Sequence, residues 1–185
     1  MNLSALKSPP FRSYVVSLHL ALNGFWAQRV IIGWLAWEMT GSAGFVGLVA
    51  FLNFFPTLFV SPLFGVFADR IDVRKGSILS YALAGILSAL FAGLCIFGSP
   101  TPVLLALFSF VTGVISSANH PMRMSLTPRL APAGDLPSVV AITSLNFNMS
   151  RLTGPAIGGI LIQTIGAPLA FAVTAVTYAV PVTAI

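Results

Sequence analysis

Charged residues are scarce in this sequence. Charged residues make up 7% of its 185 positions and only four of them are Asp or Glu, whereas 57% of all residues are hydrophobic. A soluble domain carries about 25% charged residues, so a water-exposed surface is excluded for most of the chain. The net charge of +5 does not indicate nucleic-acid binding, because the basic residues are few and scattered.

Cysteine and catalytic motifs are also scarce. The single cysteine, Cys95, lies in an apolar run and excludes an intramolecular disulfide. The chain has no H-E-x-x-H and no G-x-S-x-G motif, and its two histidines, His19 and His120, have no matching carboxylate. We therefore expect no enzyme activity, no metal site and no bound cofactor.

Long apolar runs are what the sequence does contain. A helix needs about 20 mostly apolar residues to cross a hydrocarbon core of roughly 30 Å. The runs predict an all-α integral membrane protein, with residues 1–185 forming one domain of six transmembrane helices. The predicted spans are 13–39, 44–67, 76–97, 102–120, 138–163 and 168–185. The predicted connections are TGSAG at 40–44, the charged stretch at 69–75, GSPTP at 98–102, a Pro-rich loop at 121–137 and IGAP at 165–168.

The basic residues orient these spans. Every Lys or Arg outside the spans falls on one side of the predicted topology, and the loops of the other side have none. The residues on the basic side are Lys7, Arg12, Arg70, Arg74, Lys75, Arg123 and Arg129. Cytoplasmic loops are enriched in Lys and Arg, so the N-terminus is predicted to be cytoplasmic.

Two of the spans share a pattern at a constant offset. The tripeptide LNF occurs at 52–54 and again at 145–147, and the same offset relates Pro62 to Pro155 and Gly65 to Gly158. A repeat of three helices would place the two copies in opposite directions across the bilayer. Inverted 3+3 repeats of this kind recur in secondary transporters, and the pattern indicates one here.

The stretch from Gly65 to Lys75 combines acids with bases. It resembles the signature loop between helices 2 and 3 of the major facilitator superfamily, G-x-x-x-D-R-x-G-R-R/K, with Asp72 in place of Gly and the basic pair shifted by one position. Three further stretches resemble the branch of that superfamily that contains siderophore exporters and macrolide-type efflux pumps. They are NGFWAQRVIIGWLAWEMTGS at 23–42, NHPMRMSLTPRLAP at 119–132 and DLPSVVAITSLNFNMSRLTGPAIGGIL at 135–161.

The resemblance implies two functional elements. One is a gating loop in which Asp69 pairs with Arg123 or with a helix N-terminus; its residues are Gly65, Asp69, Arg70, Asp72, Arg74, Lys75 and Arg123. The other is the helix-5 motif of exporters that run as antiporters, here Gly154, Pro155, Gly158 and Gly159. That motif is incomplete, because Ser150 and Ala141 stand where its upstream glycines would be. Small residues also serve plain helix packing in membranes.

Polar residues form stripes on two of the spans. Polar side chains within a bilayer usually face a bundle interior or a watery cavity, which makes these residues candidates for contact with a substrate. They are His19, Asn23, Trp26, Arg29, Asn146, Ser150 and Arg151. Hydrogen bonding between helices is an equal explanation for the Asn and Ser side chains. Arg29 and Arg151 would bind an anionic substrate group or pair with acids elsewhere.

The resemblance implies a secondary active transporter that exports small hydrophobic or amphipathic molecules, drug-like or siderophore-like, by alternating access. We expect proton-coupled antiport, driven by an ion or proton gradient, in a bacterial inner (plasma) membrane. A membrane scaffold or accessory subunit and an uptake symporter of the same fold remain alternatives. The expected partners are lipid, a small-molecule substrate and a second six-helix half, because this chain corresponds to the N-terminal half of a twelve-helix fold and the C-terminal half is expected to be absent from it.

Overall fold

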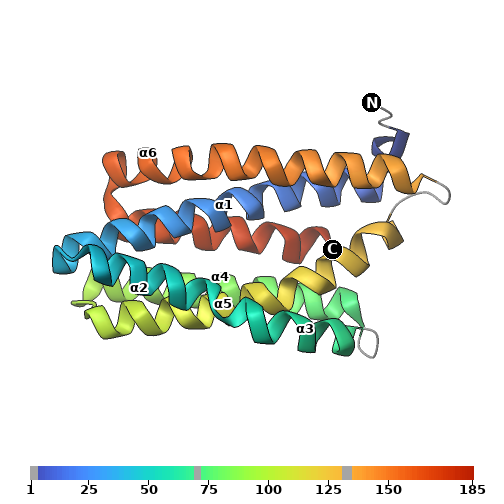
Figure 1. The fold of residues 1–185 in the computed structure, drawn as a ribbon. Coiled ribbons are helices and arrows are strands. Elements are labelled where there is room, and N and C mark those ends of the chain that lie inside the picture. Colours follow the sequence, from blue (N-terminus) through green and yellow to red (C-terminus); the bar gives the residue numbers. More distant parts are fainter. Residues whose placement is uncertain (1–3, 69–71, 131–134) are drawn as a thin grey trace.

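A computed structural model of the chain describes residues 4–68, 72–130 and 135–185, and all elements within these ranges are helical (Figure 1). The elements in chain order are η1 (Ser4–Lys7), α1 (Pro9–Thr40), α2 (Ala43–Phe54), α3 (Pro56–Ala68), α4 (Val73–Phe97), α5 (Pro102–Leu126), η2 (Thr127–Leu130) and α6 (Leu136–Ala184).

Within the described ranges, five helical stretches are long and apolar enough to cross a membrane. They are Pro9–Thr40, Ala43–Gly65, Val73–Phe97, Pro102–Leu130 and Leu136–Ala184. Large apolar side chains also point outward, including Phe97 (91% exposed) and Leu152 (77% exposed). Exposed apolar surface on this scale is unfavourable in water but not in lipid. The all-helical membrane class predicted from composition is therefore confirmed.

Short polar residues and glycine set the helix ends. Gly41 ends α1 in the left-handed region, with a φ of 60°, and its backbone N–H donates to the Trp37 carbonyl. The Ser42 side chain then accepts from the Phe45 N–H at the start of α2, and Thr101 accepts from the Leu104 N–H at the start of α5. These side chains satisfy amide groups that have no partner within the helix.

The second predicted span, 44–67, consists of two helices in succession. α2 ends at Phe54 and α3 begins at Pro56. Proline has no amide hydrogen to donate to the preceding turn, so the helical hydrogen-bond ladder is interrupted there. Phe55 between them keeps a right-handed helical conformation, and α3 continues in the general direction of α2 (Figure 1).

The fourth predicted span, 102–120, is shorter than the helix in the structure. We expected a Pro-rich loop from residue 121, but α5 continues through Pro121 to Leu126 and is followed directly by η2. A proline inside a membrane helix is tolerated when neighbouring groups take up the freed carbonyl. The predicted loop at 121–137 is correspondingly shorter, because helical structure occupies its first ten residues, 121–130.

Gly166 interrupts α6. A straight helix of 49 residues would be about 74 Å long, far more than the roughly 30 Å hydrocarbon core. Gly166 has φ 79° and ψ 161°, which is not helical, and the chain turns back there so that the two limbs of α6 run in opposite directions (Figure 1). The turn predicted at 165–168 is present.

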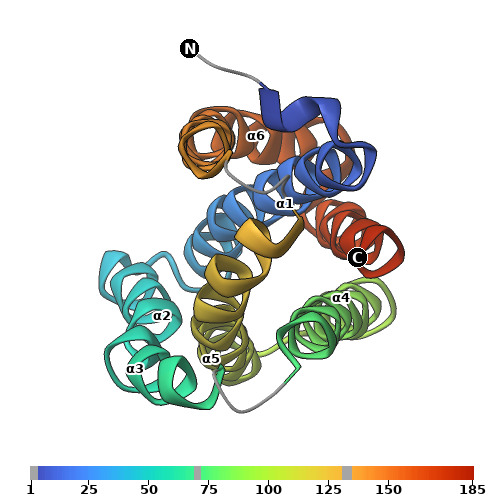
Figure 2. The ribbon, with the colours of Figure 1, turned by 90° about the vertical axis from the view of Figure 1, so that its right-hand side faces the viewer.

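The helices form one bundle in which α4 links α6 to α5. α1 packs along α6, α6 also packs against α4, and α5 packs against α2, α3 and α4 (Figure 2). At one end of the bundle, Phe91 of α4 stacks on Phe108 of α5 with ring centres 4.3 Å apart, and Phe171 of α6 meets both rings edge-on. This aromatic cluster joins three helices, while the middle of the bundle is less tightly filled.

Candidate functional site: a central cavity

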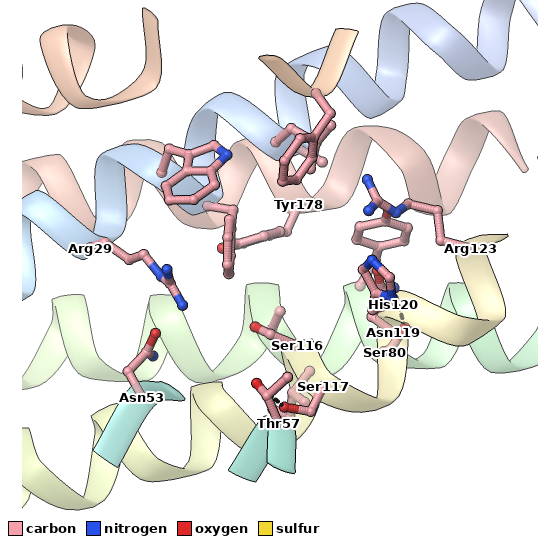
Figure 3. Close-up of a pocket in the computed structure, with 18 of the residues that line it drawn as sticks. Arg29, Asn53, Thr57, Ser80, Ser116, Ser117, Asn119, His120, Arg123 and Tyr178 are labelled. Atoms are coloured by element: carbon pink, nitrogen blue, oxygen red, sulfur yellow. Dashed lines mark hydrogen bonds between the residues drawn. The ribbon is translucent and has the colours of Figure 1, made fainter. Parts of the chain in front are cut away.

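A cavity of about 330 Å³ lies between α1, the α2–α3 segment, α4, α5 and both limbs of α6 (Figure 3). Apolar and aromatic side chains make up much of its wall, and a few polar groups converge on it. The apolar and aromatic members are Ala21, Leu22, Phe25, Trp26, Phe54, Tyr81, Ala84, Ile115, Phe147 and Tyr178. The other members are Arg29, Asn53, Thr57, Ser80, Ser116, Ser117, Asn119, His120 and Arg123. Concave, mainly apolar sites with a few placed polar groups are the usual form of a small-molecule site.

Arg29 of α1 occupies one end of this cavity. Its guanidinium carbon lies 4.7 Å from the centre of the Phe25 ring, 5.2 Å from Trp26 and 5.8 Å from Phe54. The side chain extends from α1 towards Asn53 of α2 (Figure 3). Three aromatic faces thus surround a charge that stays protonated at any physiological pH.

His120 and Arg123 of α5 occupy the opposite end (Figure 3). The Arg123 guanidinium lies 5.8 Å from the centre of the Phe147 ring. Nearby, Asn119 donates to the Ser80 hydroxyl of α4 at 2.6 Å, which ties α5 to α4 beside the cavity. Both ends of the cavity therefore carry basic side chains.

Hydrogen bonds between helices fix the walls. Gln28 of α1 donates to the Ser88 hydroxyl at 2.9 Å and accepts from the Tyr178 hydroxyl at 2.8 Å. Asn53 of α2 donates to the Ser109 carbonyl and to the Thr112 hydroxyl of α5. These bonds hold α1, α4 and α6 together on one side and α2 and α5 on the other.

The predicted polar stripes of α1 and α6 meet each other. His19 Nδ1 donates to the Asn146 carboxamide oxygen at 2.6 Å, and Asn23 donates to His19 Nε2 at 3.2 Å. Asn23 also donates to the Ser150 hydroxyl at 3.3 Å, and Thr153 donates to Asn23 at 2.6 Å. His19, Asn23, Asn146 and Ser150 thus satisfy one another across the α1–α6 contact and do not line the central cavity.

The other three predicted substrate contacts, Trp26, Arg29 and Arg151, do not all lie in the cavity wall. Trp26 and Arg29 line the cavity. Arg151 does not line it: its side chain is exposed on α6, with the guanidinium carbon 5.8 Å from the Trp26 ring centre. Trp26 therefore has an arginine near it on the cavity side and another outside the cavity.

The helix-5 motif lies where α6 crosses α1. A Cβ built on Gly158 would lie 2.8 Å from the Ala27 carbonyl oxygen, and one built on Gly154 would lie 3.0 Å from the Asn23 carbonyl oxygen. Both glycines permit close contact of the two helices. A Cβ on Gly159 would meet no described atom within 4 Å, and Pro155 is half-buried. Two of the four motif residues therefore act in helix packing.

The predicted gating loop is described only in part. Asp69 and Arg70 lie outside the described residues. Asp72 is the N-cap of α4, and its carboxylate accepts from the backbone N–H groups of Arg74 at 2.9 Å and Lys75 at 3.3 Å. Helix capping therefore explains why Asp72, one of the two acids of the loop, is an aspartate. The side chains of Arg74 and Lys75 are exposed.

Gly65 is the other described member of that loop. A Cβ built on it would meet no atom of the described residues within 4 Å, so Gly65 makes no close contact with another helix within the described part of this chain. Arg123, the expected partner of Asp69, lies in the cavity wall.

Several residues of the cavity wall were not selected from the sequence. Asn53, Thr57 and Ser117 are the main ones, and Thr57 shares a hydrogen bond of 3.0 Å with Ser117. Asn53 and Thr57 are four positions apart and so share one helix face. That spacing could have predicted a polar face on this span, but it rests on only two polar residues.

Comparisons with known proteins agree on one family. The model of the transmembrane secretion effector family matches residues 1–185. The staphyloferrin A transporter of Staphylococcus aureus is 25% identical over 90% of this chain and 42% of its own length. The multidrug efflux pump Tap of Mycobacterium tuberculosis is 27% identical over 97% of this chain and 44% of its own length.

The enterobactin exporter EntS of Shigella boydii is 31% identical over 90% of this chain and 40% of its own length. The chain thus spans less than half the length of these curated relatives. No solved structure matches it significantly. Together with the bundle of membrane-spanning helices, the match along the whole sequence shows that the chain belongs to the transmembrane secretion effector family of major facilitator superfamily transporters.

Proposed function

We propose that this chain is part of a secondary active exporter of small hydrophobic or amphipathic molecules, and that the central cavity is its substrate site. The observation that carries the proposal is the cavity itself. It is about 330 Å³ in volume, lies between α1, α2–α3, α4, α5 and both limbs of α6, and has a mainly apolar and aromatic lining. The relatives named above, a siderophore transporter, a siderophore exporter and a multidrug pump, support export as the direction.

The proposal includes six membrane crossings arranged as a 3+3 inverted repeat. The two limbs of α6, separated at Gly166, supply the fifth and sixth crossings. Support comes from the two LNF sequences: Asn53 of α2 bonds to the Thr112 hydroxyl of α5, and Asn146 of α6 bonds to His19 of α1. Thr112 and His19 are separated by the same offset as Asn146 and Asn53, so corresponding residues make corresponding contacts.

Alternating access is the proposed mechanism, with the loop after Gly65 as a gate on the cytoplasmic side. Arg123 supports this idea, because it lies at the end of the cavity formed by the C-terminal part of α5. An ion pair between Asp69 and Arg123 would stabilise one conformation by about 0.3–2 kcal/mol, enough to bias the equilibrium without fixing it. Asp69→Asn should shift the conformational populations measured by spectroscopic distance labels and alter transport. Unchanged populations and transport would refute the gate.

A second six-helix unit is the proposed partner. The relatives are more than twice as long as the segment that matches, and α2 and α3 present the exposed aromatic rings of Phe51, Phe54 and Phe59. The unit belongs to a bacterial inner membrane, uses a proton gradient and requires no bound cofactor.

The experiment is efflux of a hydrophobic fluorescent dye from inverted membrane vesicles or proteoliposomes. The protein is assayed in its natural full-length context, with and without an imposed proton gradient. Gradient-dependent accumulation or release of the dye is expected. If a correctly inserted protein moves no dye under any gradient, the exporter proposal is wrong; dye movement that ignores the gradient would remove only proton coupling.

A further inference from the structure

Arg29 is a cation within the bundle that has no counter-ion among the described residues. It is half-buried within α1, eleven residues before Thr40, which corresponds to roughly 16 Å of helix. Among the described residues no acceptor bonds to its Nε atom, which is fully buried, and no Asp or Glu lines the cavity that it enters. A charge at membrane depth is unfavourable and is normally paired or functional.

The aromatic rings around Arg29 do not replace an anion. Phe25, Trp26 and Phe54 attract the guanidinium through their faces, but a ring face accepts hydrogen bonds poorly. The Trp26 indole N–H is a second buried donor without an acceptor in the described part of the chain. Arg29 and Trp26 therefore give this end of the cavity more hydrogen-bond donors than acceptors.

The remaining polar groups do not correct that excess. The Asn53 amide nitrogen is already bonded to α5, which leaves its oxygen as a neutral acceptor facing Arg29 (Figure 3). Arg123 adds a second cation at the other end. A cavity with low-dielectric walls and basic groups at both ends concentrates anions.

We propose that the cavity takes amphipathic molecules that carry a carboxylate or a similar anionic oxygen group, with Arg29 holding that group and the aromatic wall holding the apolar body. This assignment rests on the proposed function, since it names the substrate class of the same site. The guanidinium fork suits a carboxylate, which it can bind through two parallel N–H···O bonds. Phe25 and Trp26, both partly buried beside the guanidinium, then limit the contact of the pair with water.

The test uses three probes with one apolar body and different charges: naphthalene-2-carboxylate, its neutral amide and 2-naphthylmethylammonium. Binding is measured by calorimetry on the purified full-length protein in nanodiscs of zwitterionic lipid. The variants are Arg29→Gln, Arg29→Lys and the matched control Arg151→Gln. The control removes the same charge from the other neighbour of Trp26, where the side chain is exposed and outside the cavity.

We expect the wild-type protein to bind the carboxylate about tenfold more tightly than the amide, or better. Arg29→Gln should abolish this preference while amide binding persists, and Arg151→Gln should keep it. Arg29→Lys retains the charge without the fork, so an intermediate preference is expected even if the glutamine variant does not fold.

The assignment is overturned by no preference for the carboxylate in the wild type, by a preference that survives Arg29→Gln, or by no binding of any probe. A preference that anionic lipid abolishes would assign the site to a lipid headgroup and also overturn it. Dye efflux distinguishes this failure from that of the proposed function. If the protein exports dye but shows no preference for the anionic probe, only the present inference is wrong. If it binds the anionic probe but transports no dye, only the exporter proposal is wrong.

Discussion

Neighbouring residues of α6 have opposite surroundings, although their sequence context is nearly the same. Gly158 lies against the backbone of Ala27, whereas Gly159 faces open space within the described chain. The sequence identified both as members of one motif, but their geometry differs because adjacent residues on a helix point about 100° apart.

Gly158→Ala should destabilise the protein, because the new methyl group would press on the Ala27 carbonyl. Overpacking of this kind costs about 1–3 kcal/mol. Gly159→Ala is the control and should be neutral or stabilising, since Ala is favoured over Gly in helices by up to about 1 kcal/mol. The melting temperature of each variant in detergent, followed by size-exclusion chromatography, measures both effects. Equal melting temperatures would contradict the close contact.

At the scale of the helices, ends and breaks follow local chemistry. Glycine, serine and threonine set the ends that we predicted between spans, and Gly166 breaks α6 where IGAP indicated a turn. Our prediction for the end of α5 was wrong, because Pro121 breaks helices in water but lies inside a membrane-protein helix here. The interruption between α2 and α3 at Phe55 was not predicted.

Asp72→Ala should shorten or destabilise the start of α4. The carboxylate accepts two backbone amides there, and loss of an N-cap costs about 0.5–2 kcal/mol. Asp72→Ser is the matched control, since a serine hydroxyl can cap the same amides. Hydrogen exchange of the first turn of α4 reports the change. Protection that is identical in wild type and Asp72→Ala would show that the cap contributes nothing.

Gly166→Ala should disturb the turn between the two limbs of α6. The backbone of Gly166 has a positive φ of 79°, and a side chain in that conformation costs about 1–3 kcal/mol. Gly93→Ala serves as the comparison, because Gly93 lies within helix α4 and its added Cβ meets nothing described within 4 Å. We expect a lower melting temperature for Gly166→Ala alone. A drop shared equally by both variants would rule out a specific effect of the turn.

At the scale of the whole molecule, the bundle has two chemically different ends. The N-terminal end of α1, the start of α4 and the end of α5 lie at the same end of the bundle (Figure 1). This is the end next to which Arg12, Arg74 and Arg123 fall. The arrangement matches the topology drawn from the basic residues, in which that end is cytoplasmic.

Cysteine labelling tests this orientation. In a Cys95→Ser background, Lys75→Cys should react with a membrane-impermeant maleimide only from the cytoplasmic side, and Ser99→Cys only from the opposite side. Ser99 lies in the connection between α4 and α5, at the other end of α4 from Lys75. Labelling of both positions from the same side would invalidate the topology.

The sequence by itself determined that the chain belongs in a membrane, that it is all-helical and which family it resembles, because each of these depends on composition or on short motifs; the orientation predicted from the basic residues stays a prediction. Only the tertiary structure decided which polar residues face the cavity. His19 and Asn146 have the same polar character as Asn53, yet the first two bond to each other while Asn53 lies in the cavity wall. The rotation of each helix about its axis makes that difference, and it is fixed by contacts such as Gly158 against Ala27, which connect residues far apart in the chain. The same contacts place Arg29 among three aromatic rings, with no acid of the described residues in the wall of its cavity.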